Sequence, residues 1–165
     1  MAAAAITRRS FLTGREARST TIAPPGVRGG WLAACTGCGA CVEACPTSII
    51  GLVEARPALD FSTGECLFCG ECASVCPEPV FDPVAARTFC HVVAISDACL
   101  THSGVACMTC RDACPEAAIV FRPRIGGPFV PELKASACTG CGACIAPCPA
   151  GAIAVSQPTG EAVHA

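Results

Sequence analysis

The spacing of the cysteines constrains the fold of this chain more than any other feature. The chain has 165 residues, of which 17 are cysteine. Three segments repeat the pattern C-x2-C-x2-C-x3-C-P, and these units begin at Cys35, Cys66 and Cys138. A repeat of this kind is typical of one supersecondary unit that is copied along a chain.

A further unit, the third in chain order, is stretched. It ends with Cys107, Cys110 and Cys114, and its first cysteine is either Cys99 or Cys90. The residues around Cys99 resemble those around the first cysteine of the second unit, which favours Cys99. Cys90 is then the odd thiol, and we expect it to be a small, buried apolar residue.

The rest of the composition indicates that side chains alone do not fill the interior. Leu, Ile, Val and Phe together number 36, which is few for the core of a domain of this length. The 16 glycines and 14 prolines favour short elements joined by many turns. We therefore expect a non-protein group inside the fold.

Cysteines at this spacing suit a 4Fe–4S cluster, which is held by four thiolates around a small inorganic core. Three cysteines spaced three residues apart let one tight loop reach three corners of the cube. In bacterial ferredoxins, which this pattern resembles, the fourth cysteine precedes a proline and ligates the neighbouring cluster. The clusters would replace part of the missing aliphatic core, so that cluster binding and folding are coupled.

The exchange of fourth cysteines pairs the units into two lobes and predicts four ligand sets. The two sets of the first lobe are Cys35, Cys38, Cys41 with Cys76, and Cys66, Cys69, Cys72 with Cys45. The two sets of the second lobe are Cys99, Cys107, Cys110 with Cys148, and Cys138, Cys141, Cys144 with Cys114. We expect four 4Fe–4S clusters, or three if the stretched unit is degenerate.

The expected fold class is α+β: two bacterial-ferredoxin-like lobes built around the clusters, with a basic N-terminal arm. We expect short strands at residues 58–61 and 118–121, and a short helical turn opened by the third and fourth cysteines of each unit. The expected divisions are an arm and linker at 1–30, a first lobe at 31–81, a connector at 82–98, a second lobe at 99–158 and a tail at 159–165.

A large apolar side chain stands five residues after the fourth cysteine of every unit. We expect these side chains to form a dry wall over the clusters. They are Ile50, Phe81, Ile119 and Ile153.

Charge is distributed unevenly. Residues 1–34 carry a net charge of +4 and the rest carries −6, for a total of −2. This balance argues against a nucleic-acid binder that relies on phosphate contacts, and no apolar run is long enough to span a membrane. Each oxidised cluster with its thiolates would add about −2, so the loaded body would be acidic and would suit a basic patch on a redox partner.

The arm contains a twin-arginine pair, Arg8-Arg9, but a charged stretch follows it where an export signal needs an apolar segment. We therefore expect the protein to stay in the reducing cytoplasm. The arm itself is either a disordered tail or a docking segment for a partner.

Other interpretations of the sequence fit less well. Structural zinc uses two separated pairs of ligands, whereas these units carry a third cysteine and a trailing Cys-Pro. The sequence has no Ser-His-Asp arrangement, no phosphate-binding loop and no paired carboxylates among the motif residues, so we expect an electron-transfer or accessory protein rather than an enzyme. The histidines match no ligand spacing: His91, His102 and His164.

The order of the units, the stretched third unit and the arm segment Arg8–Arg15 resemble the NapF family, the ferredoxin-type accessory proteins of the periplasmic nitrate reductase system. The resemblance covers nearly the whole chain. It implies a cytoplasmic iron–sulfur protein that binds the precursor of the catalytic subunit, NapA, before export and aids its maturation by electron transfer or cofactor assembly. The alternatives are a general polyferredoxin electron carrier and an electron-transfer subunit of a larger oxidoreductase.

Overall fold

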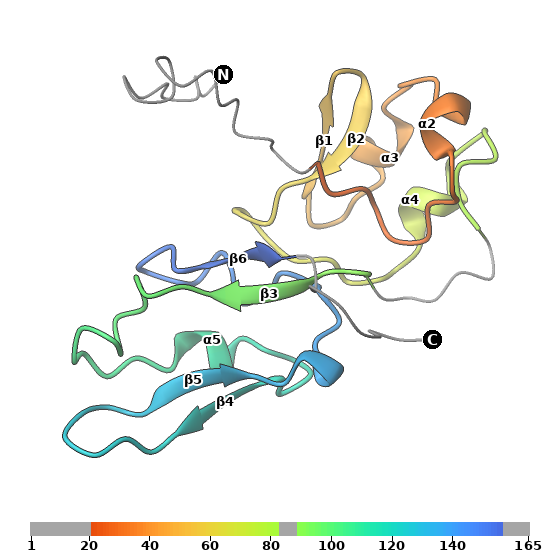
Figure 1. The fold of residues 1–165 in the computed structure, drawn as a ribbon. Coiled ribbons are helices and arrows are strands. Elements are labelled where there is room, and N and C mark those ends of the chain that lie inside the picture. The colour runs from red at the N-terminus through yellow and green to blue at the C-terminus, as the bar shows by residue number, and fades with distance from the viewer. Residues whose placement is uncertain (1–20, 83–88, 157–165) are drawn as a thin grey trace, which may run out of the picture.

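The structure, a computed structural model, describes residues 21–82 and 89–156. Most of the predicted basic arm, part of the connector and the predicted tail lie outside these residues. Figure 1 shows the described chain as two parts, which we call the first lobe (residues 21–82) and the second lobe (residues 89–156).

Short helices and one hairpin make up the first lobe. Its elements are α2 (Trp31–Ala34), α3 (Ala40–Glu43), β1 (Ile50–Val53), β2 (Arg56–Leu59) and α4 (Glu71–Ser74). Strands β1 and β2 pair antiparallel, with Ile50 opposite Leu59. The two residues between them, Glu54 and Ala55, both have positive φ, as a tight two-residue hairpin requires.

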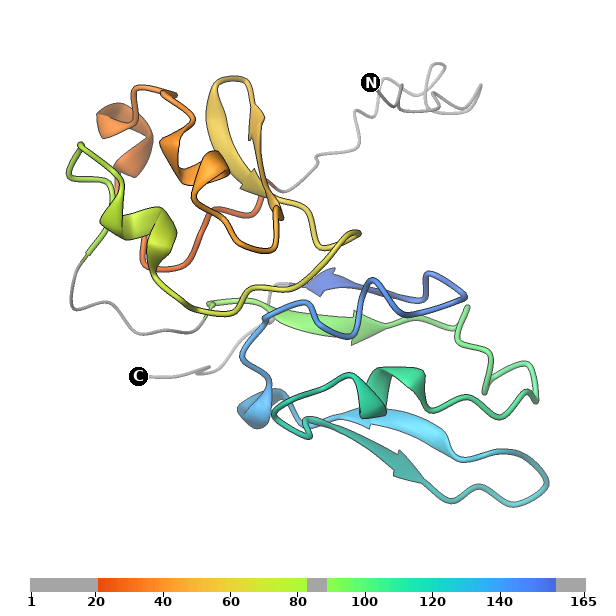
Figure 2. The ribbon, with the colours of Figure 1, turned by 180° about the vertical axis from the view of Figure 1, so that it is seen from behind.

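The second lobe holds two small sheets. Its elements are β3 (Val92–Ile95), α5 (Thr109–Asp112), β4 (Ile119–Arg122), β5 (Val130–Leu133), the 3₁₀ turn η1 (Ala135–Ala137) and β6 (Ile153–Ser156). Strands β4 and β5 form a hairpin, and β3 pairs antiparallel with β6. The β3–β6 sheet lies between the first lobe and the β4–β5 hairpin in both views (Figures 1 and 2).

The two lobes close in related ways. In the second lobe the four-residue ladder of β3 and β6 joins the beginning of the lobe to its end. In the first lobe a single bridge, Val27 with Phe81, takes this place. The Arg28 amide donates to the Val80 carbonyl at 2.9 Å, and the Asp82 amide donates to the Gly26 carbonyl at 2.8 Å. Each lobe therefore folds back on its own start.

Two segments that the sequence assigns to linkers are part of this closure. Residues 21–28 were expected in the arm and linker, yet the Ile22 carbonyl accepts the Leu59 amide at 2.8 Å. Residues 92–95 were expected in the connector and form β3, because Val92 and Val93 are buried against the second lobe. The contacts that place both segments are distant in sequence, and cysteine spacing carries no information about them.

The helical turns lie at the third cysteines of the units. Helices α3, α4 and α5 contain Cys41, Cys72 and Cys110, whereas the fourth unit forms a non-helical turn after Cys144. In front of α3 and α4 the chain turns through a left-handed glycine, but α5 begins after Met108, whose φ is −128°.

Few aliphatic side chains form the core. The buried cluster of the first lobe consists of Ile49, Ile50, Leu59, Phe61 and Phe89. Three cysteines, Cys110, Cys138 and Cys144, belong to the buried cluster of the second lobe. Phe89 comes from the start of the second lobe, so the two cores meet. No helix of the described chain is long and apolar enough to cross a membrane.

The core of the second lobe depends on single aliphatic side chains, and we predict that Ile119→Ala destabilises the protein by about 2–5 kcal/mol, because Ile119 is 1% exposed. Ile125→Ala, at a side chain that is 103% exposed, is the matched control and should leave the stability unchanged. Unfolding followed by circular dichroism measures the effect. Equal stability of the two variants would contradict this description of the core.

Candidate metal centres

Four separate cavities are each lined by four cysteines. Cavity I is lined by Cys35, Cys38, Cys41 and Cys76, and cavity II by Cys45, Cys66, Cys69 and Cys72. Cavity III is lined by Cys99, Cys107, Cys110 and Cys148, and cavity IV by Cys114, Cys138, Cys141 and Cys144. These groups have the same members as the four ligand sets that the sequence predicts.

The last two cysteines of each unit serve different cavities. In the first unit, Cys41 on α3 lines cavity I, and Cys45, just after the end of that helix, lines cavity II. The second unit contributes in the reverse order: Cys72 lines cavity II and Cys76 lines cavity I. The third and fourth units are related in the same way in cavities III and IV. In each lobe, two short turns of chain, one from each unit, therefore link the two cavities.

The apolar residues that follow each unit are buried at the cavities. Ile50, Phe81, Ile119 and Ile153 are all 9% exposed or less. Each of them lines the cavity that receives the fourth cysteine of its own unit. This arrangement keeps water away from one side of every group of four thiols.

The cavities have no cationic side chain. Neither lysine, arginine nor histidine is among the described residues that line cavities I to IV. Burial, and to a smaller extent the neighbouring thiols, raise the pKa of Cys72 and of Cys110 to about 11 and that of Cys144 to about 12. These groups become thiolates only when a bound cation compensates their charge.

A 4Fe–4S cluster fits this donor set better than a single metal ion does. Among the described residues, no three His, Cys, Asp or Glu side chains are close enough together to hold one ion. In a cluster each thiolate binds a different iron, so the four sulfurs surround a wider core. Structural zinc, which needs four ligands around one centre, does not match this arrangement.

Among the two candidates for the first cysteine of the stretched unit, only Cys99 lies with the other cysteines of cavity III. This cysteine lines cavity III, whereas Cys90 lies in a different cavity, and its thiol is exposed. The expectation that Cys90 is buried is wrong, because it follows Phe89 at the surface where the two lobes meet. Fully buried Thr101 orders the insert: its hydroxyl lies 3.3 Å from Cys99 Sγ, and its carbonyl accepts a bond from Arg124 at 2.9 Å.

Threonines beside the cysteines escaped the sequence-based reasoning. A threonine two residues after a cysteine contacts its sulfur at Thr47, Thr101 and Thr109, at 3.5, 3.3 and 3.5 Å. Burial opposes ionisation of Cys45, but hydrogen bonds from Thr47 and from the backbone outweigh it and lower the pKa of this thiol. The recurring Cys-x-Thr sequence was the available signal.

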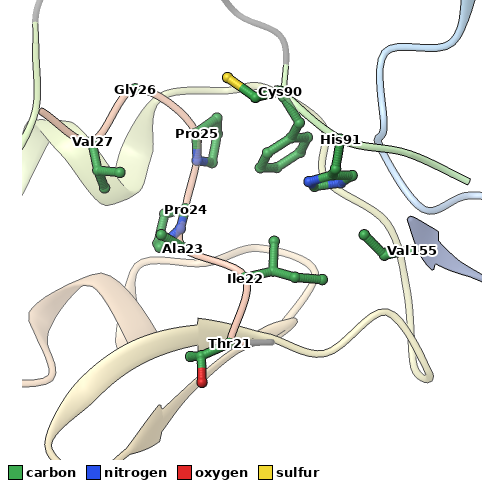
Figure 3. A pocket seen from close by; sticks show the side chains of 11 residues that line it. Thr21, Ile22, Ala23, Pro24, Pro25, Gly26, Val27, Cys90, His91 and Val155 are labelled. Carbon is green, nitrogen blue, oxygen red and sulfur yellow. The ribbon is translucent and has the colours of Figure 1, made fainter. Parts of the chain in front are cut away.

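A larger cavity of about 370 Å³ contains none of the predicted ligands. It lies between residues 21–27 of the first lobe and Phe89, Cys90, His91 and Val155 of the second. Figure 3 shows the side chains of Ile22, His91 and Val155 around it. The odd cysteine therefore belongs to the boundary between the lobes and not to a group of four.

Comparison with known proteins agrees with this arrangement. The family model of the 4Fe–4S dicluster domain matches residues 34–80 and 105–152. The chain is 40% identical over 162 residues to the ferredoxin-type protein NapF of Escherichia coli (strain K12), with 96% of both chains covered. It belongs to the NapF family of ferredoxin-type proteins.

Two further relatives are also ferredoxin-type proteins. The chain is 41% identical to NapF of Haemophilus influenzae over 128 residues, which cover 77% of this chain and 73% of that protein. It is 30% identical over 161 residues to the methylamine utilization ferredoxin-type protein MauM of Methylorubrum extorquens, with 85% and 73% covered. The second dicluster match begins after Cys99, which sets the stretched unit apart from the general pattern.

The loop of cavity IV requires glycine at position 142, and we predict that Gly142→Ala destabilises the protein. A Cβ there would lie 2.2 Å from the Phe61 ring, and φ is +83°. Overpacking of this kind costs about 1–3 kcal/mol in addition to the backbone strain. Gly70→Ala is the matched control, because its φ is +80° and nothing lies within 4 Å of its Cβ position. Thermal unfolding compares the two, and an equal loss of stability would contradict the close contact with Phe61.

Proposed function

We propose that cavities I to IV hold four 4Fe–4S clusters and that the protein transfers single electrons. The observation that carries this proposal is that sixteen cysteines line four cavities in groups of four, with no cationic side chain among the described lining residues. Membership of the ferredoxin-type family supports it. A bound cluster supplies one-electron redox chemistry at potentials that its surroundings set.

The chain's own residues hold and tune these sites. The thiolates bind iron, and the apolar side chains at Ile119 and its equivalents exclude water from one side. Threonine hydroxyls near Cys45, Cys99 and Cys107 are in a position to donate to the thiolate sulfurs. Hydrogen bonds of this type stabilise negative charge on sulfur and raise a cluster's reduction potential.

We further propose that the protein acts in the cytoplasm on the precursor of the periplasmic nitrate reductase catalytic subunit, aiding its maturation before export. Support comes from the similarity to NapF proteins over 96% of the chain. The role would consist of electron transfer to the precursor or help with assembly of its cofactors. The acidic charge of the body with bound clusters and the basic sequence of residues 1–20 would attract oppositely charged parts of such a partner.

A second candidate is a general electron carrier that serves more than one oxidoreductase. The observation in its favour is the 30% identity to MauM, a ferredoxin-type protein named for methylamine utilization. Similar ferredoxin-type proteins are thus named for different redox systems, which is what a general carrier predicts. The two candidates differ in whether one partner is bound specifically.

The iron content tests the ligand sets. We expect about 16 iron atoms per chain after purification without air, about 12 in Cys99→Ser, and again about 16 in the matched control Cys90→Ser, because each cluster contains four irons. Iron and acid-labile sulfide analysis measures this. A loss of iron in Cys90→Ser, with Cys99→Ser unchanged, would reverse the assignment of the third unit.

The partner is tested by capture of unexported nitrate reductase catalytic subunit on the holoprotein. The specific role predicts binding that weakens as salt increases. If residues 1–20 are a docking arm, their removal should abolish or weaken this binding; if they take no part, binding should be unchanged. Truncation must stop at residue 20, since Ile22 and Val27 are bonded into the first lobe. Failure of the fully loaded full-length protein to bind would favour the general carrier.

A further inference from the structure

We propose that the two lobes form one electron-transfer unit, in which electrons pass between cavities II and IV through a fixed contact of their loops. This inference rests on the proposed function, because it needs clusters in both lobes. The residues of the contact, which we call the junction, are Phe61, Cys66, Phe68, Phe89, His91 and residues 139–142.

The ligand loops of the two lobes are bonded directly to each other. The backbone amide of Cys66 donates to the carbonyl of Cys141 at 2.9 Å. Cys66 lines cavity II and Cys141 lines cavity IV. A direct backbone hydrogen bond between the lobes therefore joins one proposed cluster ligand to another.

Aromatic packing buries this contact. Phe61 and Phe68 come from the first lobe, and Phe89 and His91 come from the second. The Phe89 ring stacks on His91 with centroids 4.4 Å apart, and it lies 6.1 Å from Phe61 and 5.4 Å from Phe68. Phe61, Phe89 and His91 are each 8% exposed or less. Buried rings of both lobes thus interlock beside the bond between the loops.

The loop of cavity IV is held on both sides of Cys141. The His91 Nε2 donates to the Gly140 carbonyl at 2.9 Å, and the Phe89 amide donates to the Thr139 carbonyl at 3.2 Å. The Phe61 ring occupies the space over Gly142, where it leaves no room for a Cβ. Side chains of both lobes therefore fix the position of this loop relative to cavity II.

The junction completes a path through all four cavities. Within each lobe, the turns that carry paired cysteines such as Cys41 and Cys45 link the two cavities. The order of the path is then I, II, IV, III. In each step one electron leaves a reduced cluster and reduces its oxidised neighbour, and no bond forms or breaks. The first electron comes from an external low-potential one-electron donor.

Electron transfer within one molecule differs in its kinetics from electron transfer between molecules. Holding donor and acceptor in place converts a bimolecular step into a unimolecular one, whose rate does not depend on protein concentration. If no electron passes between the lobes within a molecule, electrons would redistribute only through collisions between molecules, at a rate that rises with protein concentration. The concentration dependence of electron redistribution therefore separates an electron path from contacts that only stabilise the fold.

The experiment photoreduces the holoprotein with less than one electron per chain, using a flavin photosensitiser with a sacrificial donor. Samples are frozen at increasing times, and their electron paramagnetic resonance spectra are compared with the equilibrium spectrum at the same degree of reduction. The wild type should reach the equilibrium spectrum at a rate that is independent of protein concentration. In Phe61→Ala and His91→Leu the rate should fall at least about tenfold, because the ligand loops of the two lobes are no longer held in position relative to each other.

Phe129→Ala is the control, since Phe129 is 47% exposed and is not part of the junction. It should behave as the wild type does. Phe61→Leu retains buried apolar volume and replaces Phe61→Ala if the alanine variant loses iron. Junction variants that keep all their iron and redistribute electrons as fast as the wild type would overturn the proposal.

Iron analysis of the same samples keeps the two proposals apart. A wild type with four clusters whose electrons redistribute at a concentration-dependent rate would refute the junction and leave the cluster assignment standing. A wild type with no iron in one lobe would refute the proposed function, and the junction with it.

Discussion

Negative charge on buried sulfur is the constraint on which the rest of this structure depends. Sixteen thiols are gathered in groups of four, and burial raises the pKa of the innermost ones, to about 12 at Cys144. No lysine or arginine is among the described residues that line the four cavities. At these innermost cysteines the thiolate form depends on a cationic metal core. The small number of bulky aliphatic residues is then understandable, because the interior is shared with an inorganic group.

The exchange of the fourth cysteine makes each lobe a cooperative unit. A unit such as Cys35 to Cys45 contributes to both cavities of its lobe, and the apolar residue that follows it covers the second of them. Neither cavity is complete without both units. A local cysteine motif is in this way converted into contacts between segments that are distant in sequence.

The sequence was sufficient for what cysteine spacing determines and insufficient for what long-range packing determines. The four groups of cysteines, the burial of Ile50, Phe81, Ile119 and Ile153, and the helical turns at three of the four units were all predictable from local patterns. The pairing of β3 with β6 was not, because nothing near residues 92–95 indicates a partner at residues 153–156. The docking of Phe61 on Gly142 and the exposure of Cys90 likewise depend on how the lobes meet.

The unequal closure of the two lobes determines which lobe loses its clusters first. The second lobe is fastened by a four-residue ladder, whereas the first is held by the Val27–Phe81 bridge and a few bonds beside it. Local opening follows the weakest set of contacts. Damage by oxygen or depletion of iron should therefore begin in the first lobe, and a chain stripped of half its metal would retain its C-terminal half intact.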